Sequence, residues 1–381
     1  MARYKQRPEY GDSIPGLFDG FDAARGDDAP GGLDLFPEPE PLPTHPSIEA
    51  AARRHAQGAD RSRDRDAASR GDADFALDSV PRTPRAPIFD ADDLTPLETP
   101  RADDRLAFIS FGSGSSGNCA YIGDSEGGLL IDAGVDASAV EEELHRNGIG
   151  PDRIRGILLT HDHSDHVRYV YALVRKRPWI SVYCTPRVMN GMLRRHNISR
   201  RIKDYHRAIY KEHPFRVGGF TVTPFEVMHD GSDNAGFFIA HGRHRMAVAT
   251  DLGCVSERAD FYMSQANYLM IEANYDESML AAGTYPEYLK ARIRSANGHL
   301  CNDAAAEYLG RVYNPAMRNI FLCHLSKDNN TPALAIHAVE SALAARGVSV
   351  GDGSGTPYAR QADVQLIALP RFESTGLVIL R

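Results

Sequence analysis

The segment Thr160-His-Asp-His-Ser-Asp-His166 determines how the rest of the chain is interpreted. It holds three histidines and two aspartates and directly follows a short apolar run that predicts a buried strand. Side chains on alternate residues of an extended turn project to the same side, so we expect His161 and His163 to bind one metal ion. Asp165 and His166 begin the next helix and can turn toward a second ion. The alternative, a solvated polar loop, leaves this spacing of ligands unexplained.

Three further donors stand at the ends of other apolar runs. His229, Asp251 and His324 each follow a run that predicts a strand, and a site can form outside the carboxyl ends of strands. A single residue of this kind can equally be a surface residue or a cap, but three of them beside Thr160–His166 predict a site for two metal ions. Imidazole and carboxylate donors without a thiolate suit zinc, manganese or iron, and we expect zinc or manganese.

The composition divides the chain into two parts. The formal net charge of the 381 residues is −8, but residues 1–104 alone hold 13 Lys and Arg against 22 Asp and Glu, with 13 of the 23 prolines. Such a segment buries too little apolar surface to offset the entropy of ordering it, so we predict a disordered, acidic, Pro-rich tail over 1–104. Residues 105–381 hold 30 basic against 29 acidic residues and form the predicted folded domain.

Patterns of strands and helices alternate through residues 105–381. Strands are predicted at 106–111, 119–122, 128–131, 154–160, 180–184, 220–229, 237–240, 246–251, 268–272 and 320–323. Helices are predicted at 137–147, 167–176, 187–197, 285–295, 302–311 and 332–346. Two runs of strands, each interleaved with helices, predict two sheets packed face to face with helices outside.

The sequence also predicts where the protein acts. No apolar run reaches the roughly 18 residues that span a bilayer, and the first ten residues lack the apolar stretch of a signal peptide. We therefore expect a cytoplasmic protein without membrane contact. The five scattered cysteines contain no CxxC pair, which argues against a disulfide framework or a structural zinc knuckle.

Taken together, these residues resemble the metallo-β-lactamase superfamily, whose signature is HxHxDH followed by downstream His, Asp and His ligands. Within it the chain resembles the YycJ/WalJ-type hydrolases, a group associated with 5′ to 3′ DNA exonuclease activity. The motifs that carry the resemblance are Phe111–Asn118, Leu130–Gly134, Thr160–His166, Ala249–Gly253, Glu272–Asp276, Gly298–Leu300 and His324–Asn330. The match covers about residues 106–381 and implies a metallo-β-lactamase-fold hydrolase domain, an α/β (α+β) four-layer αββα sandwich.

The resemblance also implies a role for each site residue. One metal ion is expected on His161, His163 and His229, and the other on Asp165, His166 and His324. Asp251 is expected to bridge the two ions, and Asp132 to orient a metal-binding imidazole. His299 resembles the non-ligand histidine that the tRNA 3′-processing relatives use near the leaving group. Cys301 departs from the pattern, because YycJ-like sequences usually have Ser there, which affects only a local hydrogen bond.

This arrangement predicts a hydrolytic reaction in which Asp165 and His299 are the catalytic side chains. Two adjacent cations lower the pKa of a bridging water and offset charge on a five-coordinate phosphorus. His299 can protonate the leaving oxygen or hold a phosphate. The alternative for His299 is a packing or capping role, because Asn302-Asp303 begins a helix directly after it.

Two segments predict a phosphate-containing substrate. Residues 187–211, the basic segment, hold eight Lys and Arg against one acid, with interleaved aromatic residues, as backbone binding to nucleic acid requires. Within it Arg194, Arg195, Arg200 and Arg201 are the expected contacts, although a solvated helical face is the alternative. The loop Gly112–Asn118 can approach an anion through backbone N–H groups, and its expected phosphate contacts are Ser115, Ser116 and Asn118.

The leading hypothesis is therefore a two-metal phosphodiesterase, a 5′ to 3′ exonuclease that acts on DNA rather than RNA. One alternative is a hydrolase of a small (phospho)ester or thioester at the same dinuclear site, and another is a non-catalytic regulatory scaffold. A further hypothesis concerns Leu33–Phe36 in the tail, within Gly32-Leu-Asp-Leu-Phe36, which resembles peptides that dock on the bacterial DNA sliding clamp but lacks the usual leading Gln. Coincidence is the alternative for so short a motif.

Overall fold

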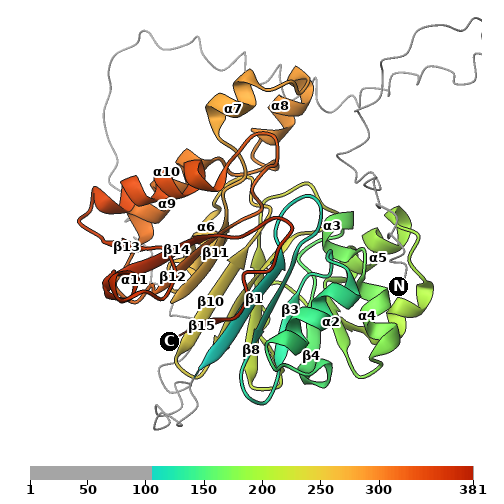
Figure 1. Ribbon diagram of the computed structural model, residues 1–381. Helices are drawn as coiled ribbons and strands as arrows, with labels where there is room; N and C mark the ends of the chain where they lie inside the picture. The colour runs from blue at the N-terminus through green and yellow to red at the C-terminus, as the bar shows by residue number, and fades with distance from the viewer. Residues whose placement is uncertain (1–104, 381) are drawn as a thin grey trace, which may run out of the picture. The chain divides into compact units, whose positions relative to one another are not determined.

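The computed structural model describes residues 105–380, which form two β-sheets (Figure 1). The first sheet has the spatial order β15 (Val378–Leu380), β1 (Leu106–Gly112), β2 (Cys119–Gly123), β3 (Gly128–Ile131), β4 (Ile154–Leu158), β5 (Ser181–Cys184) and β6 (His206–Ala208). The second has the order β13 (Val350–Gly351), β14 (Val364–Ala368), β12 (Asn319–Cys323), β11 (Tyr268–Glu272), β10 (His244–Ala249), β9 (Ala235–His241), β8 (Phe220–Glu226) and β7 (Phe215–Val217).

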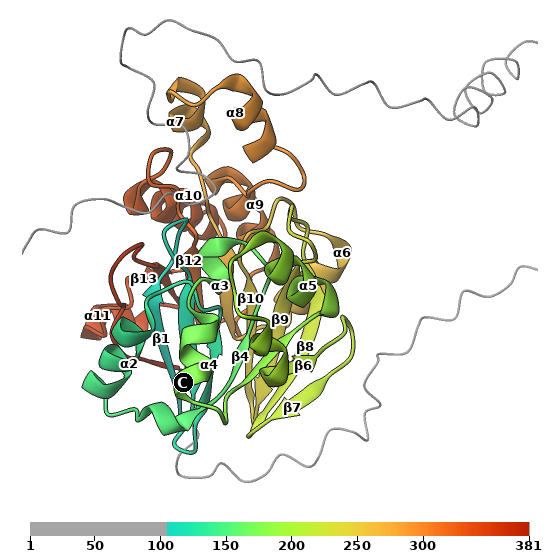
Figure 2. The same ribbon diagram turned by 90° about the vertical axis from the view of Figure 1, so that its right-hand side faces the viewer.

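Helices flank both sheets and connect their strands. The α-helices of the first half are α2 (Ala137–Arg146), α3 (Ser164–Val167), α4 (Val170–Lys176) and α5 (Pro186–Arg195), with 3₁₀ turns at Pro151–Arg153 and Arg200–Tyr205. Those of the second half are α6 (Glu257–Met263), α7 (Glu277–Ala282), α8 (Glu287–Ile293), α9 (Asn302–Val312), α10 (Pro332–Ala344) and α11 (Pro357–Gln361). The pair α7 and α8 lies beyond the ends of the strands (Figures 1 and 2).

Three apolar layers hold these elements together. The middle layer joins the inner faces of the two sheets, where the rings of Phe108 in β1 and Phe321 in β12 have centroids 4.4 Å apart. One outer layer packs α2, α4 and α5 on the first sheet, and the other packs α6, α9 and α10 on the second. The order is therefore helix, sheet, sheet, helix, which confirms the predicted four-layer αββα sandwich.

The observed elements match the predicted ones closely, with a few informative differences. The helix predicted at 167–176 is two helices, because the Tyr169 N–H donates to the carbonyl of Ala133 (2.9 Å) instead of continuing the helical ladder. The short helices α6, α7 and α11 and the strands β6, β7, β13, β14 and β15 were not predicted. The helix α2 ends before Gly148, whose φ of +72° is the left-handed conformation that glycine commonly adopts after the end of a helix.

The strand ends that matter for function lie at one edge of the sandwich. β3 and β4 are parallel in the first sheet, and β10, β11 and β12 are parallel in the second, so their carboxyl ends point the same way. Asp132, Asp251 and His324, which follow β3, β10 and β12, have φ values of 60°, 50° and 54°. Non-glycine residues adopt this left-handed conformation at a cost of about 1–3 kcal/mol each, and such strain clusters at functional sites.

Two predictions concern features outside these layers. None of the helices in residues 105–380 is long and apolar enough to cross a membrane. The predicted disordered tail and its segment Leu33–Phe36 lie outside the described residues.

Candidate metal centre

The loop after β4 brings its ligands together through hydrogen bonds to neighbouring strand ends. The Asp132 carboxylate, just beyond β3, accepts hydrogen bonds from the Thr160 N–H (2.9 Å) and the Thr160 hydroxyl (2.9 Å). On the far side of the loop, the fully buried Asp162 carboxylate accepts from the N–H (2.8 Å) and hydroxyl (2.7 Å) of Ser232. Both anchors hold the loop between the two sheets, so the two histidines on either side of Asp162 face the same space.

The structure brings together the three imidazoles that were expected to share one ion, and they form the first group of possible donors. Donor atoms of His161, His163 and His229 all lie within 4.8 Å of one another. His229 Nε2 lies 3.4 Å from His163 Nδ1. Two nitrogens that bind one zinc ion at about 2.1 Å are roughly 3.4 Å apart at a tetrahedral angle. His229 Nδ1 lies 2.9 Å from the carbonyl of Gly298, which requires the proton on Nδ1 and leaves Nε2 as the donor to a metal.

A second group contains Asp165, His166 and His324, whose donor atoms also lie within 4.8 Å of one another. His166 Nε2 is 3.4 Å and His324 Nε2 is 3.6 Å from Asp165 Oδ2. The other nitrogen of His166, Nδ1, lies 2.8 Å from Asp132 Oδ2. Asp132 therefore holds the His166 ring so that Nε2 faces Asp165.

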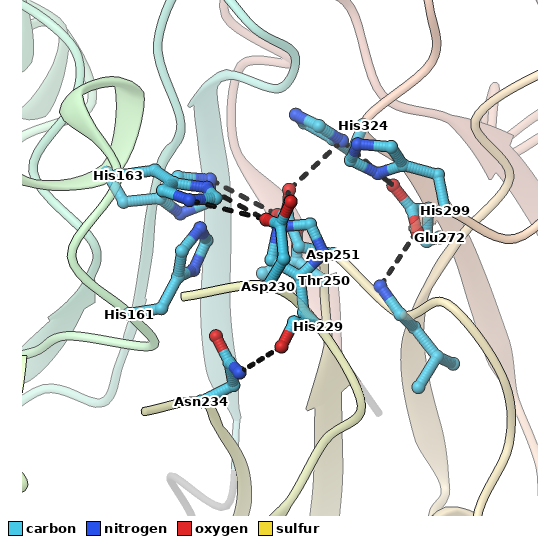
Figure 3. A network of polar contacts seen from close by, with 12 residues as sticks. His161, His163, His229, Asp230, Asn234, Thr250, Asp251, Glu272, His299 and His324 are labelled. Carbon is cyan, nitrogen blue, oxygen red and sulfur yellow. Dashed lines mark hydrogen bonds and ion pairs between the residues drawn. The ribbon is translucent and has the colours of Figure 1, made fainter. Parts of the chain in front are cut away.

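Asp251 lies between the two groups. One of its oxygens is 3.2 Å from His166 Nε2 in the second group, and the other is 3.8 Å from His229 Nε2 in the first. The Thr250 hydroxyl donates to Asp251 Oδ2 (2.8 Å) and fixes the rotamer of the carboxylate. Asp251 is only 2% exposed, so its charge needs compensation from groups inside the site (Figure 3).

The pKa shifts of the buried groups indicate that the carboxylates of the site require positive charge nearby. Burial raises the pKa of the Asp251 carboxyl, but the imidazoles of His324 and His166 outweigh burial and hold that pKa well below its usual range. Burial lowers the pKa of His324, but the Asp251 carboxylate outweighs burial and raises it to about 10. Burial lowers the pKa of His163 to about 4. The raised pKa keeps His324 protonated when no cation is present. Because imidazoles bind a metal in their neutral form, a metal ion would displace that proton and take over the compensation of the carboxylates.

The donors therefore fit divalent cations. His161 Nε2 and His324 Nε2 are buried and make no hydrogen bond, although buried polar atoms normally have a partner. Both residues belong to the groups described above, and a metal ion would supply the missing partner. Imidazole and carboxylate ligands without thiolate are the donor set expected for zinc or manganese.

Glu272, at the end of β11, is a buried carboxylate in contact with the site that the sequence reasoning did not assign. It is fully buried, and its Oε1 lies 2.7 Å from His299 Nδ1 and 2.9 Å from His324 Nδ1. Its Oε2 accepts hydrogen bonds from the N–H groups of Leu252 (2.7 Å) and Leu300 (3.1 Å). The sequence did contain a signal for Glu272, because it stands at the end of an apolar run just as Asp251 does.

Asp230 is a second carboxylate that the sequence reasoning did not assign. Its Oδ1 is buried without a hydrogen-bond partner and lies 3.4 Å from His163 Nε2 and 3.5 Å from His229 Nε2. Its Oδ2 accepts a hydrogen bond from Nε of Arg292, which comes from α8 (2.8 Å). Figure 3 shows Asp230 and Asp251 both directed toward the histidines. Its place directly after His229 was the only signal in the sequence.

His299 lies beside both groups of donors. Its ring centroid is 5.0 Å from that of His229 and 5.3 Å from that of His324, and the residue is 8% exposed. The helix α9 begins three residues later, and the cap of that helix is Cys301, whose Sγ accepts from the Ala304 N–H (3.4 Å). The capping role considered for His299 therefore belongs to Cys301.

The residues predicted to contact substrate occupy two different environments. Asn118 is buried, and its amide lies 3.1 Å from Asp165 Oδ2 and 2.9 Å from His166 Nε2, so it contacts the predicted ligands directly. Ser115 is half-buried and Ser116 is exposed in the same loop. The four predicted contacts in the basic segment, Arg194, Arg195, Arg200 and Arg201, are exposed, as are Arg187 and Arg207. Among them Arg195 lies 3.5 Å from Asp162, which ties the segment to the ligand loop.

Comparisons with known proteins find relatives of this chain. The Beta-lactamase superfamily domain matches residues 128–324. The chain is 34% identical to exodeoxyribonuclease YycJ of Bacillus anthracis over 248 residues, which are 65% of this chain and 92% of that protein. It is 32% identical to exodeoxyribonuclease WalJ of Streptococcus pneumoniae serotype 2 over 240 residues, which are 63% of this chain and 88% of that protein.

Solved structures show the same fold at lower identity. Zn²⁺-bound PqqB of Methylobacterium extorquens superposes with a TM-score of 0.51 at 18% identity, over 72% of this chain and 99% of that one. The metallo-β-lactamase fold protein YhfI of Bacillus subtilis superposes with a TM-score of 0.50 at 12% identity, over 71% of this chain and 99% of that one. This chain therefore belongs to the metallo-β-lactamase superfamily, as a YycJ/WalJ-like hydrolase.

Proposed function

We propose that the protein is a metal-dependent 5′ to 3′ exonuclease that hydrolyses phosphodiester bonds of DNA, with its catalytic domain in residues 105–381. The observation that carries this proposal is the pair of donor groups joined by Asp251, whose oxygens lie 3.2 Å from His166 Nε2 and 3.8 Å from His229 Nε2. The two relatives named exodeoxyribonucleases, matched over 92% and 88% of their lengths, support DNA as the substrate. Action on chromosomal DNA would place the protein in the cytoplasm.

The proposed ligands follow from the two groups of donors. His161, His163 and His229 would hold one divalent ion, and Asp165, His166 and His324 the other, with Asp251 shared between them. Zinc and manganese are the ions that suit these donors. When bound, two such ions supply a hydroxide at neutral pH and stabilise negative charge on the phosphoryl oxygens.

The protein's own side chains would prepare the site for this reaction. Asp132 and Gly298 fix the proton-bearing nitrogens of His166 and His229, so each ring presents its other nitrogen to the centre. The side-chain amide of Asn118 would hold the Asp165 carboxylate in position through its contact with Asp165 Oδ2. These groups are held by buried hydrogen bonds, so the site needs little reorganisation when a substrate binds.

His299 would transfer a proton to the leaving oxygen. Glu272 lies 2.7 Å from His299 Nδ1, so Nδ1 carries the proton that this contact requires and Nε2 is the nitrogen that can exchange a proton with substrate. Positioned proton transfer of this kind contributes about 10²–10⁴ to a rate. The basic segment supports a polyanionic substrate, because its exposed arginines can bind successive phosphates.

A nuclease assay with end-labelled DNA tests this function. Single- and double-stranded DNA labelled at the 5′ or the 3′ end would be incubated with the protein and Mn²⁺ or Zn²⁺, beside the Asp165→Ala variant. We expect mononucleotides to be released first from the 5′ label, and we expect the variant to be inactive. Equal product with the variant, or none with either protein while small esters are hydrolysed, would refute the nuclease function and favour the small-ester alternative.

A further inference from the structure

A hollow of about 150 Å³ lies next to the candidate metal centre. Its walls include Ser116 and Gly117 from the loop after β1, Gly134 after β3, Arg168 after α3, and Arg371 and Phe372 near the C-terminus. Arg168, Arg371 and Phe372 belong to none of the donor groups of the candidate metal centre. The hollow therefore combines one loop predicted to contact phosphate with three side chains that the sequence reasoning did not use.

The hollow shares a rigid wall with the second group of donors. Gly134 is packed so closely that a Cβ there would lie 1.5 Å from the carbonyl oxygen of Asp165, and a Cβ at Gly117 would lie 2.6 Å from the carbonyl oxygen of Gly134. Asn118, the residue after Gly117, contacts the Asp165 carboxylate at 3.1 Å. A DNA strand bound at the second group of donors would therefore need to extend only a short distance along its backbone to reach the hollow.

Two arginines give the hollow a positive charge. Arg371 donates from Nη1 to the carbonyl of Leu325, which follows the predicted ligand His324, and its Nη2 lies 3.5 Å from the Ser115 hydroxyl. Arg168 is exposed at the other side, with its Nη1 3.5 Å from the carbonyl of Ser116. The acid in the wall, Asp136, accepts hydrogen bonds from the first turn of α2, which stabilise its charge locally.

Phe372 adds an aromatic face. It is 66% exposed, and the guanidinium carbon of Arg371 lies 5.2 Å from its ring centroid. Burial in the protein core therefore does not account for this ring. Aromatic rings beside arginines are the groups on which proteins stack the bases of single-stranded nucleic acid, and each stacked base is worth about 1–3 kcal/mol.

The size of the hollow indicates what it can hold. Sites that enclose a whole small-molecule ligand measure roughly 300–1,000 Å³. At about 150 Å³, this hollow suits one group of a longer chain, such as a single base or phosphate, whose remainder lies outside. A polymer bound across the metal centre would present such a group, whereas a small ester would not extend to it.

We propose that this hollow binds one nucleotide of the DNA strand next to the phosphodiester bond that is cleaved. The base stacks on Phe372, and the phosphate of that nucleotide is contacted by Arg168 and the Ser116 loop. Arg371 holds the ring and the loop in place through Leu325 and Ser115. This inference rests on the proposed nuclease function and specifies how that site selects a nucleic-acid strand.

Substitutions at Phe372 and Arg168 test the proposal. The full-length variants Phe372→Ala, Phe372→Tyr and Arg168→Gln would be compared with wild type on a 5′-labelled single-stranded 20-mer and on bis(p-nitrophenyl) phosphate. We expect the ratio of kcat/KM for DNA to kcat/KM for the small ester to fall at least about fivefold in Phe372→Ala and Arg168→Gln, mainly through KM. Phe372→Tyr keeps the aromatic face and should keep the wild-type ratio.

Matched surface variants control for general effects. Tyr358→Ala removes a ring that is 83% exposed in α11, and Arg175→Gln removes an exposed arginine in α4. Neither should change the ratio, and thermal melting should be the same for all variants. If wild type cleaves DNA and Phe372→Ala leaves the ratio unchanged, the proposed nucleotide site is wrong but the nuclease function stands. A wild-type protein that hydrolyses the small ester but not DNA would overturn both this proposal and the nuclease function.

Discussion

Glu272 Oε1 lies 2.7 Å from Nδ1 of His299 and 2.9 Å from Nδ1 of His324. One buried carboxylate thus joins a proposed metal ligand to the proposed proton donor. Its other oxygen is occupied by two backbone N–H groups, so Glu272 cannot turn away from the histidines without leaving buried donors unpaired.

Replacing Glu272 should therefore weaken two functions at once. We expect Glu272→Gln to lower both kcat on DNA and metal affinity by about 10–100-fold. Substitution of residues that hydrogen-bond to metal-binding histidines commonly has effects of this size. Metal affinity would be measured by competition with a chelator, and kcat from initial rates at saturating metal. An unchanged metal affinity with normal kcat would show that the carboxylate only packs between the strands.

His299→Ala should separate proton transfer from metal binding. The ring is not part of the two His and Asp groups proposed to hold the ions, so we expect bound metal per protein to stay the same. We expect kcat to fall about 10²–10⁴-fold, the usual contribution of a positioned proton donor. His337→Ala, at an exposed histidine in α10, is the matched control. Loss of metal together with activity would instead assign His299 as a ligand.

The sequence predicted the parts of the site that depend on local spacing. The Thr160–His166 loop and the donors after β8, β10 and β12 were found because a strand end and a polar residue are adjacent in the chain. Glu272 and Asp230 were missed because their partners, including His299 and Arg292, come from other elements. The break between α3 and α4 was missed for the same reason, since the Tyr169 N–H bonds to Ala133 across the fold.

Asp230→Asn tests a contribution of the second unassigned carboxylate to the metal centre. Its Oδ1 lies 3.4 Å from His163 Nε2, and its negative charge should favour a cation on the first group of histidines. We expect the variant to bind one of two metal equivalents about tenfold more weakly, in line with other groups adjacent to metal ligands. Arg292→Gln keeps the carboxylate and serves as the control. Equal metal affinity in Asp230→Asn and wild type would limit Asp230 to pairing with Arg292.

Metal removal should destabilise the folded domain. Without an ion, His161 Nε2 and His324 Nε2 remain buried with no hydrogen-bond partner beside ionised carboxylates. We expect protein treated with a chelator to melt at a lower temperature, and addition of zinc or manganese at 100 times its Kd to restore about 2.7 kcal/mol. Calorimetry in both states measures the difference. A melting temperature that is independent of metal would contradict strong binding to the native state.

The basic segment should govern how DNA binding depends on salt. Arg194, Arg200 and Arg201 are exposed and no ion pair is recorded for them in the described structure, so each can contact a phosphate. Their combined substitution by Gln should lower DNA affinity and reduce the slope of log K against log salt by about 0.7 per lost contact on a single strand. The control is a triple Gln variant of exposed arginines from other elements, Arg311, Arg318 and Arg360. If both triple variants show the same slope, the segment is a solvated surface, and the strand must be held by other groups. A smaller slope in the first variant alone would place the DNA backbone across α5 and the 3₁₀ turn that follows it.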